Sequence, residues 1–216
     1  QYVDYLERHY GRYVVIVFDD YCNGPTIKDQ EHRRRALKCA PDIILDAANI
    51  AYRDQGAFLG NERNKCAFIS LLSSRFQSVG YIVQQAVDDA DTLVAKVALE
   101  LAAAQHIVSV IASDTDILVL LLAHYKSEMF DIYMYSHPSQ RVNSIRSIAE
   151  ALGPSIVSRL LLIHAISGCD TTSCLFGHGK ISVYKRLSKA RDIQPLVDTL
   201  QSSKASHEEV MHAGCA

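Results

Sequence analysis

The strongest constraint on this chain is the placement of closely spaced carboxylates at the ends of its expected regular elements. Asp89 and Asp91 stand at the start of a helical pattern, in which apolar residues recur at spacings of three and four. Asp114 and Asp116 follow residues 107–112, a short and continuously apolar run that is typical of a strand buried on both faces. In open α/β sheets, ligands bind at the edge where parallel strands end. The sequence therefore predicts an acidic site at such an edge.

Helix capping is a simpler explanation for part of each cluster. A carboxylate at a helix N-terminus accepts hydrogen bonds from unpaired backbone N–H groups and is favoured by the helix dipole. Capping explains one carboxylate in each cluster, but it explains the presence of two clusters less well. Like charges about 4 Å apart repel by roughly 4 kcal/mol at an effective dielectric near 20, so converging carboxylates need cations between them. Oxygen ligands without thiolate or imidazole partners suit Mg²⁺ or Mn²⁺.

Alternating strand and helix patterns define the expected fold. Strands are expected at residues 13–18, 43–45, 81–83, 107–112 and 131–135. Helices are expected at residues 1–10, 28–38, 64–77, 144–152 and 155–166, and directly after Asp91. Such alternation favours an α/β fold with a mainly parallel sheet and helices on both faces.

Composition places the chain among ordinary globular proteins. Its 216 residues are 49% hydrophobic and 21% charged, which suffices for one sizeable domain or one domain with an appendage. No apolar run approaches the roughly 20 residues of a membrane span, so no membrane partner is expected. None of the six cysteines forms the C-x-x-C pair of a usual zinc site, and scattered thiols favour an intracellular compartment. The net charge of −2 leaves any nucleic-acid binding to local patches.

Other motifs extend the acidic pattern and add basic residues. Asp19 follows the strand expected at residues 13–18, and Asp170 follows the helix expected at residues 155–166. Residues 28–38 are strongly basic, and the sequence leaves open whether they form a solvated helix face or one that faces an anion. Residues 177–180 form a Gly-rich turn followed by further basic residues. Glycine permits close backbone approach, and a helix N-terminus can bind phosphate.

A series of acidic motifs runs along the chain. In order, these are V-F-D at Asp19, D-x-D at Asp89 and Asp91, D-x-D at Asp114 and Asp116, and G-C-D at Asp170. This series resembles the structure-specific 5′ nucleases, the flap endonuclease and XPG group within the PIN-like superfamily. The resemblance covers roughly residues 13–190 and is closest to a divergent metazoan branch of that group. The hallmarks of the branch are F-L-x-N-x-x-N-K at residues 58–65 and G-C-D-T-T at residues 168–172.

The resemblance implies a nuclease that acts on structured DNA, at 5′ flaps or branched ends, or on RNA. It implies a PIN-like, XPG-I-type core over residues 1–170 and a helix-hairpin-helix-like segment over residues 171–216. Two ions, Mg²⁺ or Mn²⁺, would be held by Asp19, Asp89, Asp91, Asp114, Asp116 and Asp170. The scissile phosphate would be steered by Lys28, Arg33 and Arg34, and the duplex backbone would be gripped by Gly177, Gly179 and Lys180. It further implies a nuclear protein with a role in DNA repair.

The sequence departs from the family in several places. The family's first acidic strand, which precedes the helix corresponding to residues 1–10, is absent, and because the chain begins with Gln1 we expect it to be part of a longer protein. Asp20 replaces the glycine that usually follows V-F-D, and the first D-x-D is usually E-x-E. The negative net charge is also unusual for a DNA enzyme.

Two other functions compete with a nuclease. Phosphatases of the haloacid dehalogenase type also place D-x-D after a strand, but a Thr normally stands two residues beyond the second Asp, where this chain has Leu118. The second alternative is a catalytically inactive nuclease fold that binds nucleic acid or protein. His164 lies on an apolar helical stretch, and we interpret it as a packing residue rather than a ligand.

Overall fold

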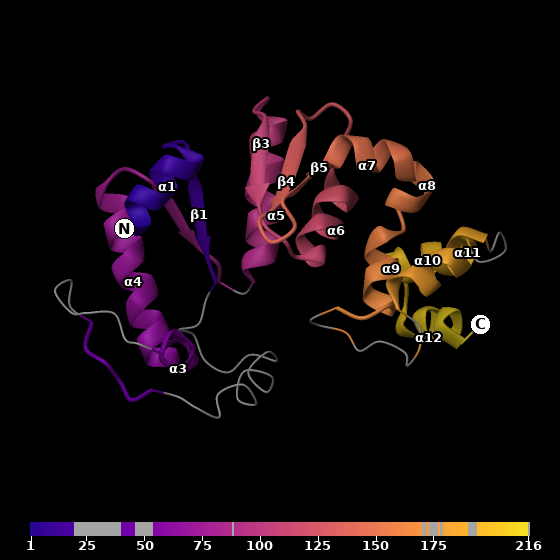
Figure 1. Ribbon diagram of the computed structural model, residues 1–216. Coiled ribbons are helices and arrows are strands. Elements are labelled where there is room, and N and C mark those ends of the chain that lie inside the picture. The colour runs from indigo at the N-terminus through magenta and orange to yellow at the C-terminus, as the bar shows by residue number, and fades with distance from the viewer. Residues whose placement is uncertain are drawn as a thin grey trace. The chain divides into compact units, whose positions relative to one another are not determined.

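A computed structural model of the chain describes residues 1–19, 40–45, 54–87, 89–169, 172, 177, 179–189 and 194–215. The chain divides into two compact units, Gln1–Leu93 and Val94–Ala216 (Figure 1). The expected domain division after residue 170 stays a prediction. No helix in the described ranges has both the length and the apolar composition needed to cross a bilayer.

The first unit packs helices against a pair of parallel strands. In chain order its elements are α1 (Tyr2–Tyr10), β1 (Val15–Phe18), α3 (Gln55–Gly60), α4 (Glu62–Ser78) and β2 (Ile82–Gln85). β1 and β2 pair in parallel register from Val15↔Ile82 to Phe18↔Gln85. The buried Phe76 of α4 stacks on Phe18 with ring centroids 6.4 Å apart, which fixes the helix on the strand pair.

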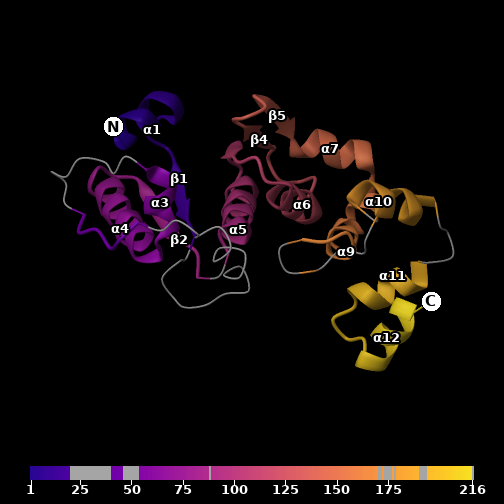
Figure 2. The same ribbon diagram turned by 60° about the horizontal axis from the view of Figure 1, so that its bottom comes forward.

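The second unit contains a three-stranded sheet and most of the helices. Helix α5 (Ala90–Ala103) begins just before the division between the units and leads into β3 (Val108–Ile111), α6 (Thr115–His124), β4 (Ile132–Ser136) and β5 (Arg141–Ser144). β3 and β4 pair in parallel, and β4 and β5 pair antiparallel. The chain continues through α7 (Ile145–Leu152), α8 (Pro154–Val157), α9 (Leu160–Ile166), α10 (Lys180–Lys189), α11 (Gln194–Gln201) and α12 (His207–Cys215). Helices α9 to α12 follow one another in a group, in which α9 packs against α6 (Figure 2).

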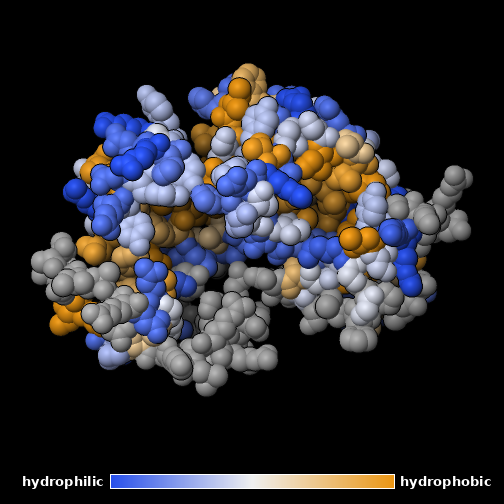
Figure 3. Space-filling view, viewed as in Figure 1, coloured by the Kyte–Doolittle hydropathy of each residue, from blue (hydrophilic) through white to orange (hydrophobic). Residues whose placement is uncertain are grey.

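The main core lies between one face of this sheet and three helices. The sheet contributes Val110, Ile132 and Met134, which are 6%, 0% and 3% exposed. Helix α5 presents only alanines to this core at its fully buried positions, so its backbone can approach the strands closely. On the face of the molecule shown in Figure 3, both hydrophobic and hydrophilic residues are exposed.

These observations confirm the expected α/β class with parallel strand pairing, although the parallel pairs are small. Against expectation, residues 43–45 form no strand, and residues 155–166 divide into α8 and α9 instead of forming one helix. The polar strand β5 was not predicted. Strand β3 is also buried on one face only, since Val110 is buried whereas Ile111 is 45% exposed.

The break between α8 and α9 has a local cause. The backbone N–H of Arg159 donates to the carbonyl oxygen of Ile156 at 3.0 Å, a bond that spans three residues and closes the last turn of α8 tightly. The Ser158 hydroxyl donates to the carbonyl oxygen of Ser155 at 3.1 Å. A side chain that bonds to the backbone of its own helix competes with the regular ladder and favours an end.

Candidate functional site

The first acidic group gathers where the parallel strand pair ends. Asp19 directly follows β1, and its Oδ1 accepts a hydrogen bond of 3.2 Å from the backbone N–H of Ala90, the first residue of α5. The carbonyl oxygen of Phe18 accepts another from the N–H of Ala86 at 2.9 Å, just beyond β2. These contacts bring Asp19 to the helix start that carries Asp91.

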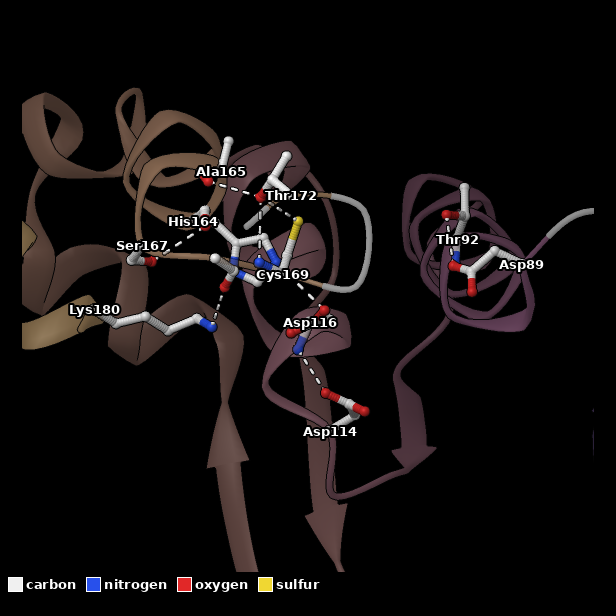
Figure 4. Close-up of polar contacts among 11 residues, drawn as sticks. Asp89, Thr92, Asp114, Asp116, His164, Ala165, Ser167, Cys169, Thr172 and Lys180 are labelled. Atoms are coloured by element: carbon white, nitrogen blue, oxygen red, sulfur yellow. Dashed lines mark hydrogen bonds and ion pairs between the residues drawn. The ribbon is translucent and has the colours of Figure 1, made fainter. Parts of the chain in front are cut away.

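Asp89 caps the N-terminus of α5. Its Oδ2 accepts hydrogen bonds from both the backbone N–H and the hydroxyl of Thr92, each at 3.1 Å (Figure 4). This is the hydrogen-bonding pattern of an N-cap carboxylate. A carboxylate has two oxygens and about four acceptor directions, so the cap leaves Asp89 able to accept further contacts.

The second acidic group repeats this arrangement at the start of α6. Asp114 is the N-cap residue, and its Oδ1 accepts a hydrogen bond of 2.9 Å from the backbone N–H of Asp116. Asp116 lies in the first turn of the same helix, beyond the end of β3. In each of the two D-x-D motifs, therefore, the first Asp caps a helix and the second lies in its first turn.

Asp116 has a partner that sequence reasoning did not identify. Nε2 of His164, on α9, lies 3.5 Å from Oδ2 of Asp116, and the two side chains are 12% and 23% exposed. His164 was interpreted as a packing residue, and it is indeed mostly buried. The signal available in the sequence was a His on an apolar helix, six residues before the aspartate of G-C-D. This signal does not identify Asp116 as the partner of His164.

Residues of the Gly-rich turn form hydrogen bonds within the protein itself. Nζ of Lys180 donates a 3.0 Å hydrogen bond to the carbonyl oxygen of Gly168, beyond the end of α9. Gly177 has φ of 77°, which favours glycine. Gly179 lies outside this range, and a Cβ there would meet no atom of a described residue within 4 Å. The carbonyl oxygen of Gly179 accepts the first hydrogen bonds of α10, from Ser182 and Val183. A role for this turn in DNA binding stays a prediction.

Lys65 is a cation near the first acidic group. It lies on α4, where burial lowers the pKa of its ammonium group, while the nearby carboxylate of Asp19 acts in the opposite direction. The sequence distinguished Lys65 only as the last residue of the F-L-x-N-x-x-N-K stretch, and did not predict an interaction with Asp19.

The carboxylates have the chemistry of a divalent-cation site, because they offer only hard oxygen donors, which suit Mg²⁺ or Mn²⁺. In the part of the chain that the structure describes, however, no group of three or more His, Cys, Asp or Glu side chains is arranged to hold a metal ion. Asp170 and the expected phosphate-steering residues, Lys28, Arg33 and Arg34, lie outside the described residues. Convergence of all six acids on one centre therefore stays a prediction.

Comparison with known proteins identifies the fold. No family model and no curated protein sequence matches the chain significantly. Among solved structures it resembles T5 5′-exonuclease with divalent zinc ions bound, at 14% identity and a TM-score of 0.53, covering 99% of this chain and 73% of that one. It also resembles the T5 D15 protein co-crystallised with metal ions, at 14% identity and a TM-score of 0.54, covering 99% and 75%. The chain therefore shares the fold of these solved structures, which is the PIN-like fold expected from the sequence.

Proposed function

We propose that this chain is the core of a divalent-metal-dependent nuclease of the flap endonuclease and XPG group, and that it hydrolyses phosphodiester bonds at 5′ flaps or branched ends of DNA. The observation that carries the proposal is the hydrogen bond from Ala90 to Asp19, which brings the acid at the end of β1 to the acidic start of α5. The same acid-bearing helix start recurs at α6. A nuclear location, a role in DNA repair and membership of a divergent metazoan branch belong to the same proposal.

The residues divide into three roles in this proposal. Two ions, Mg²⁺ or Mn²⁺, would be held directly or through water by Asp19, Asp89, Asp91, Asp114, Asp116 and Asp170. Such ions, when bound, activate a water and stabilise the leaving oxygen of an in-line displacement. Orienting the scissile phosphate would fall to Lys28, Arg33 and Arg34. Contact with the duplex backbone would fall to Gly177, Gly179 and Lys180.

The cap hydrogen bonds are compatible with metal binding. Each uses one carboxylate oxygen, Oδ2 in Asp89 and Oδ1 in Asp114, and holds the side chain at the strand edge. A carboxylate has about four acceptor directions, so a cap hydrogen bond does not by itself prevent cation binding. Fixing a ligand in this way reduces the entropy lost when the ion binds.

An inactive nuclease fold that binds nucleic acid or protein is the second candidate. The same caps favour it, because N-capping alone is sufficient reason for Asp89 and Asp114 to be present. Substitutions at Asp114 separate the two functions.

Asparagine is about as good an N-cap as aspartate, whereas alanine loses the cap at a cost of about 1 kcal/mol. We expect Asp114→Asn and Asp114→Ala both to abolish Mn²⁺-dependent cleavage of a 5′-flap duplex by the full protein. Both should also reduce the rise in Tm that millimolar Mn²⁺ causes, since that rise measures binding to the native state. Only Asp114→Ala should lower the Tm of the metal-free protein.

Several results are decisive for this proposal. A parent protein that binds flap DNA, cleaves none and keeps its Tm in Mn²⁺ would establish the inactive module. If Asp114→Asn cleaves as fast as the parent, Asp114 is a cap and not a ligand. Cleavage of the matching RNA flap at an equal rate would extend the substrate class.

A further inference from the structure

The side chain of His164 joins α9 to the acidic start of α6. Its Nε2 lies 3.5 Å from Oδ2 of Asp116, an acid of the second D-x-D motif (Figure 4). The distance exceeds the usual 2.7–3.2 Å of an N–H···O hydrogen bond. Contacts of this kind are often long in a ligand-free site and shorten when the site is assembled.

Oδ2 of Asp116 is an acceptor, so the imidazole must carry a hydrogen on Nε2 to face it favourably. The other ring nitrogen, Nδ1, is buried and has no hydrogen-bond partner among the described residues. A purely apolar side chain of the same size would avoid this buried unpaired nitrogen, which is unfavourable. Packing alone is therefore a poor reason for histidine at this position.

The end of α9 that carries His164 is held by side chains from the following segment. The Ser167 hydroxyl donates to the carbonyl oxygen of His164 itself at 3.2 Å. The Thr172 hydroxyl donates to the carbonyl oxygen of Ala165 at 2.7 Å, and Lys180 donates to that of Gly168. These bonds hold carbonyl groups at and just beyond the C-terminus of α9, and they limit movement of the imidazole.

We propose that His164 is a positioning residue that holds the Asp116 carboxylate in the orientation needed to bind a divalent cation. The proposal rests on the proposed function, because it assigns a second contact to one of its metal ligands. The terminal torsion of an aspartate is broad, so an N–H donor on Oδ2 restricts the carboxylate and directs Oδ1 away from the imidazole. Outer contacts of this type typically change metal affinity or activity by 10–100-fold.

The test compares two substitutions of His164 in the full protein, with Mn²⁺ alone as the probe. His164→Leu keeps an apolar side chain of similar size and removes the donor. His164→Gln keeps an N–H donor on a side chain long enough to reach Asp116. His124→Leu, at the exposed C-terminal end of the same α6, is the matched control.

We expect His164→Leu to weaken Mn²⁺ binding, measured by titration calorimetry, by about 10–100-fold. The Tm without metal should stay the same or rise, because Leu removes the unpaired buried nitrogen. His164→Gln should retain most of the affinity, and His124→Leu all of it. A residue that served only packing would change the metal-free Tm and leave the Mn²⁺ affinity as it was.

Two results would overturn the inference in distinguishable ways. If the parent binds Mn²⁺ and His164→Leu binds it equally well, or if the Gln and Leu variants lose affinity equally, His164 does not orient Asp116 and the proposed nuclease is unaffected. If neither the parent nor Asp116→Asn binds Mn²⁺, the metal site itself is wrong, and the role of His164 is lost with it.

Discussion

Asn64 is a buried polar side chain of the first unit, and replacing it should be costly. It is 1% exposed, and its amide joins α4 to residues 40–45. Oδ1 accepts a 2.7 Å hydrogen bond from the N–H of Ile43, and Nδ2 donates a 3.0 Å bond to the carbonyl oxygen of Pro41. Asn64→Ala removes both bonds and leaves a cavity.

The magnitude follows from what remains unpaired. A buried donor or acceptor without a partner costs about 1–3 kcal/mol, and two such groups remain after the substitution, in partly buried positions. Because water can reach part of this segment, we take the lower half of that range for each group. Asn64→Ala should therefore destabilise the first unit by about 2–4 kcal/mol.

Arg63→Ala is the matched control, because Arg63 contacts the same segment by a different interaction. Its guanidinium lies 2.7 Å from Oδ2 of Asp42, with both side chains largely exposed. Hydrogen bonds from Asn61 and Arg63 lower the pKa of Asp42, and the bond from Asn61 has the larger effect. An exposed pair of this kind is screened by water and contributes little. Arg63→Ala should leave stability nearly unchanged.

Urea denaturation followed by circular dichroism measures the global effect of each substitution. Amide hydrogen exchange measures the local effect, since protection of Ile43 depends on Asn64. In Asn64→Ala we expect the Ile43 amide to exchange at the rate of an open loop. An unprotected Ile43 in the parent, or equal destabilisation by Arg63→Ala, would contradict this role of Asn64.

The remaining predictions concern the Gly-rich turn. Lys180→Ala should flatten the slope of log affinity for duplex DNA against log salt by about 0.9 if Lys180 contacts a phosphate, while Lys204→Ala, on an exposed turn, should not. A lower Tm without a change of slope would show that Lys180 stabilises the protein through its bond with Gly168 and does not contact a phosphate. Gly177→Ala should cost about 1 kcal/mol because of its positive φ, whereas Gly179→Ser should be tolerated in thermal melts, because Ser caps helices and its Cβ meets no atom.

The elements that the sequence predicted best are those with a strong local pattern. Branched apolar runs marked β1 and β3, and the apolar stripe after Asp91 marked α5. Strand β5 was missed because Arg141–Ser144 has the sequence RVNS, which is largely polar, and it becomes a strand only by pairing with β4. Such pairing is a tertiary effect that a local window does not contain.

Residues 43–45 illustrate the opposite error, since Ile43, Ile44 and Leu45 have the composition of a strand. Backbone groups of their segment instead form hydrogen bonds with the side chains of Asn61, the cap of α4, and Asn64, within α4. In a strand, a neighbouring strand would provide these bonds. The asparagines of F-L-x-N-x-x-N-K thus have a structural role: Asn61 caps α4, and Asn64 anchors the segment that follows the basic residues. Nothing in the sequence links the two segments, which lie about twenty positions apart.

The acidic residues show why local reasoning could locate the site but not establish its function. A cap and a metal ligand require the same residue type at the same place, a carboxylate where a strand gives way to a helix. Capping accounts for Asp89 and Asp114, but not for the second member of each pair. Asp116 lies in the first turn of α6. Its carboxylate faces His164, a residue that is distant in sequence. The case for chemistry at this edge therefore depends more on Asp91 and Asp116 than on the caps, and substitutions of those two should affect metal binding without removing a helix cap.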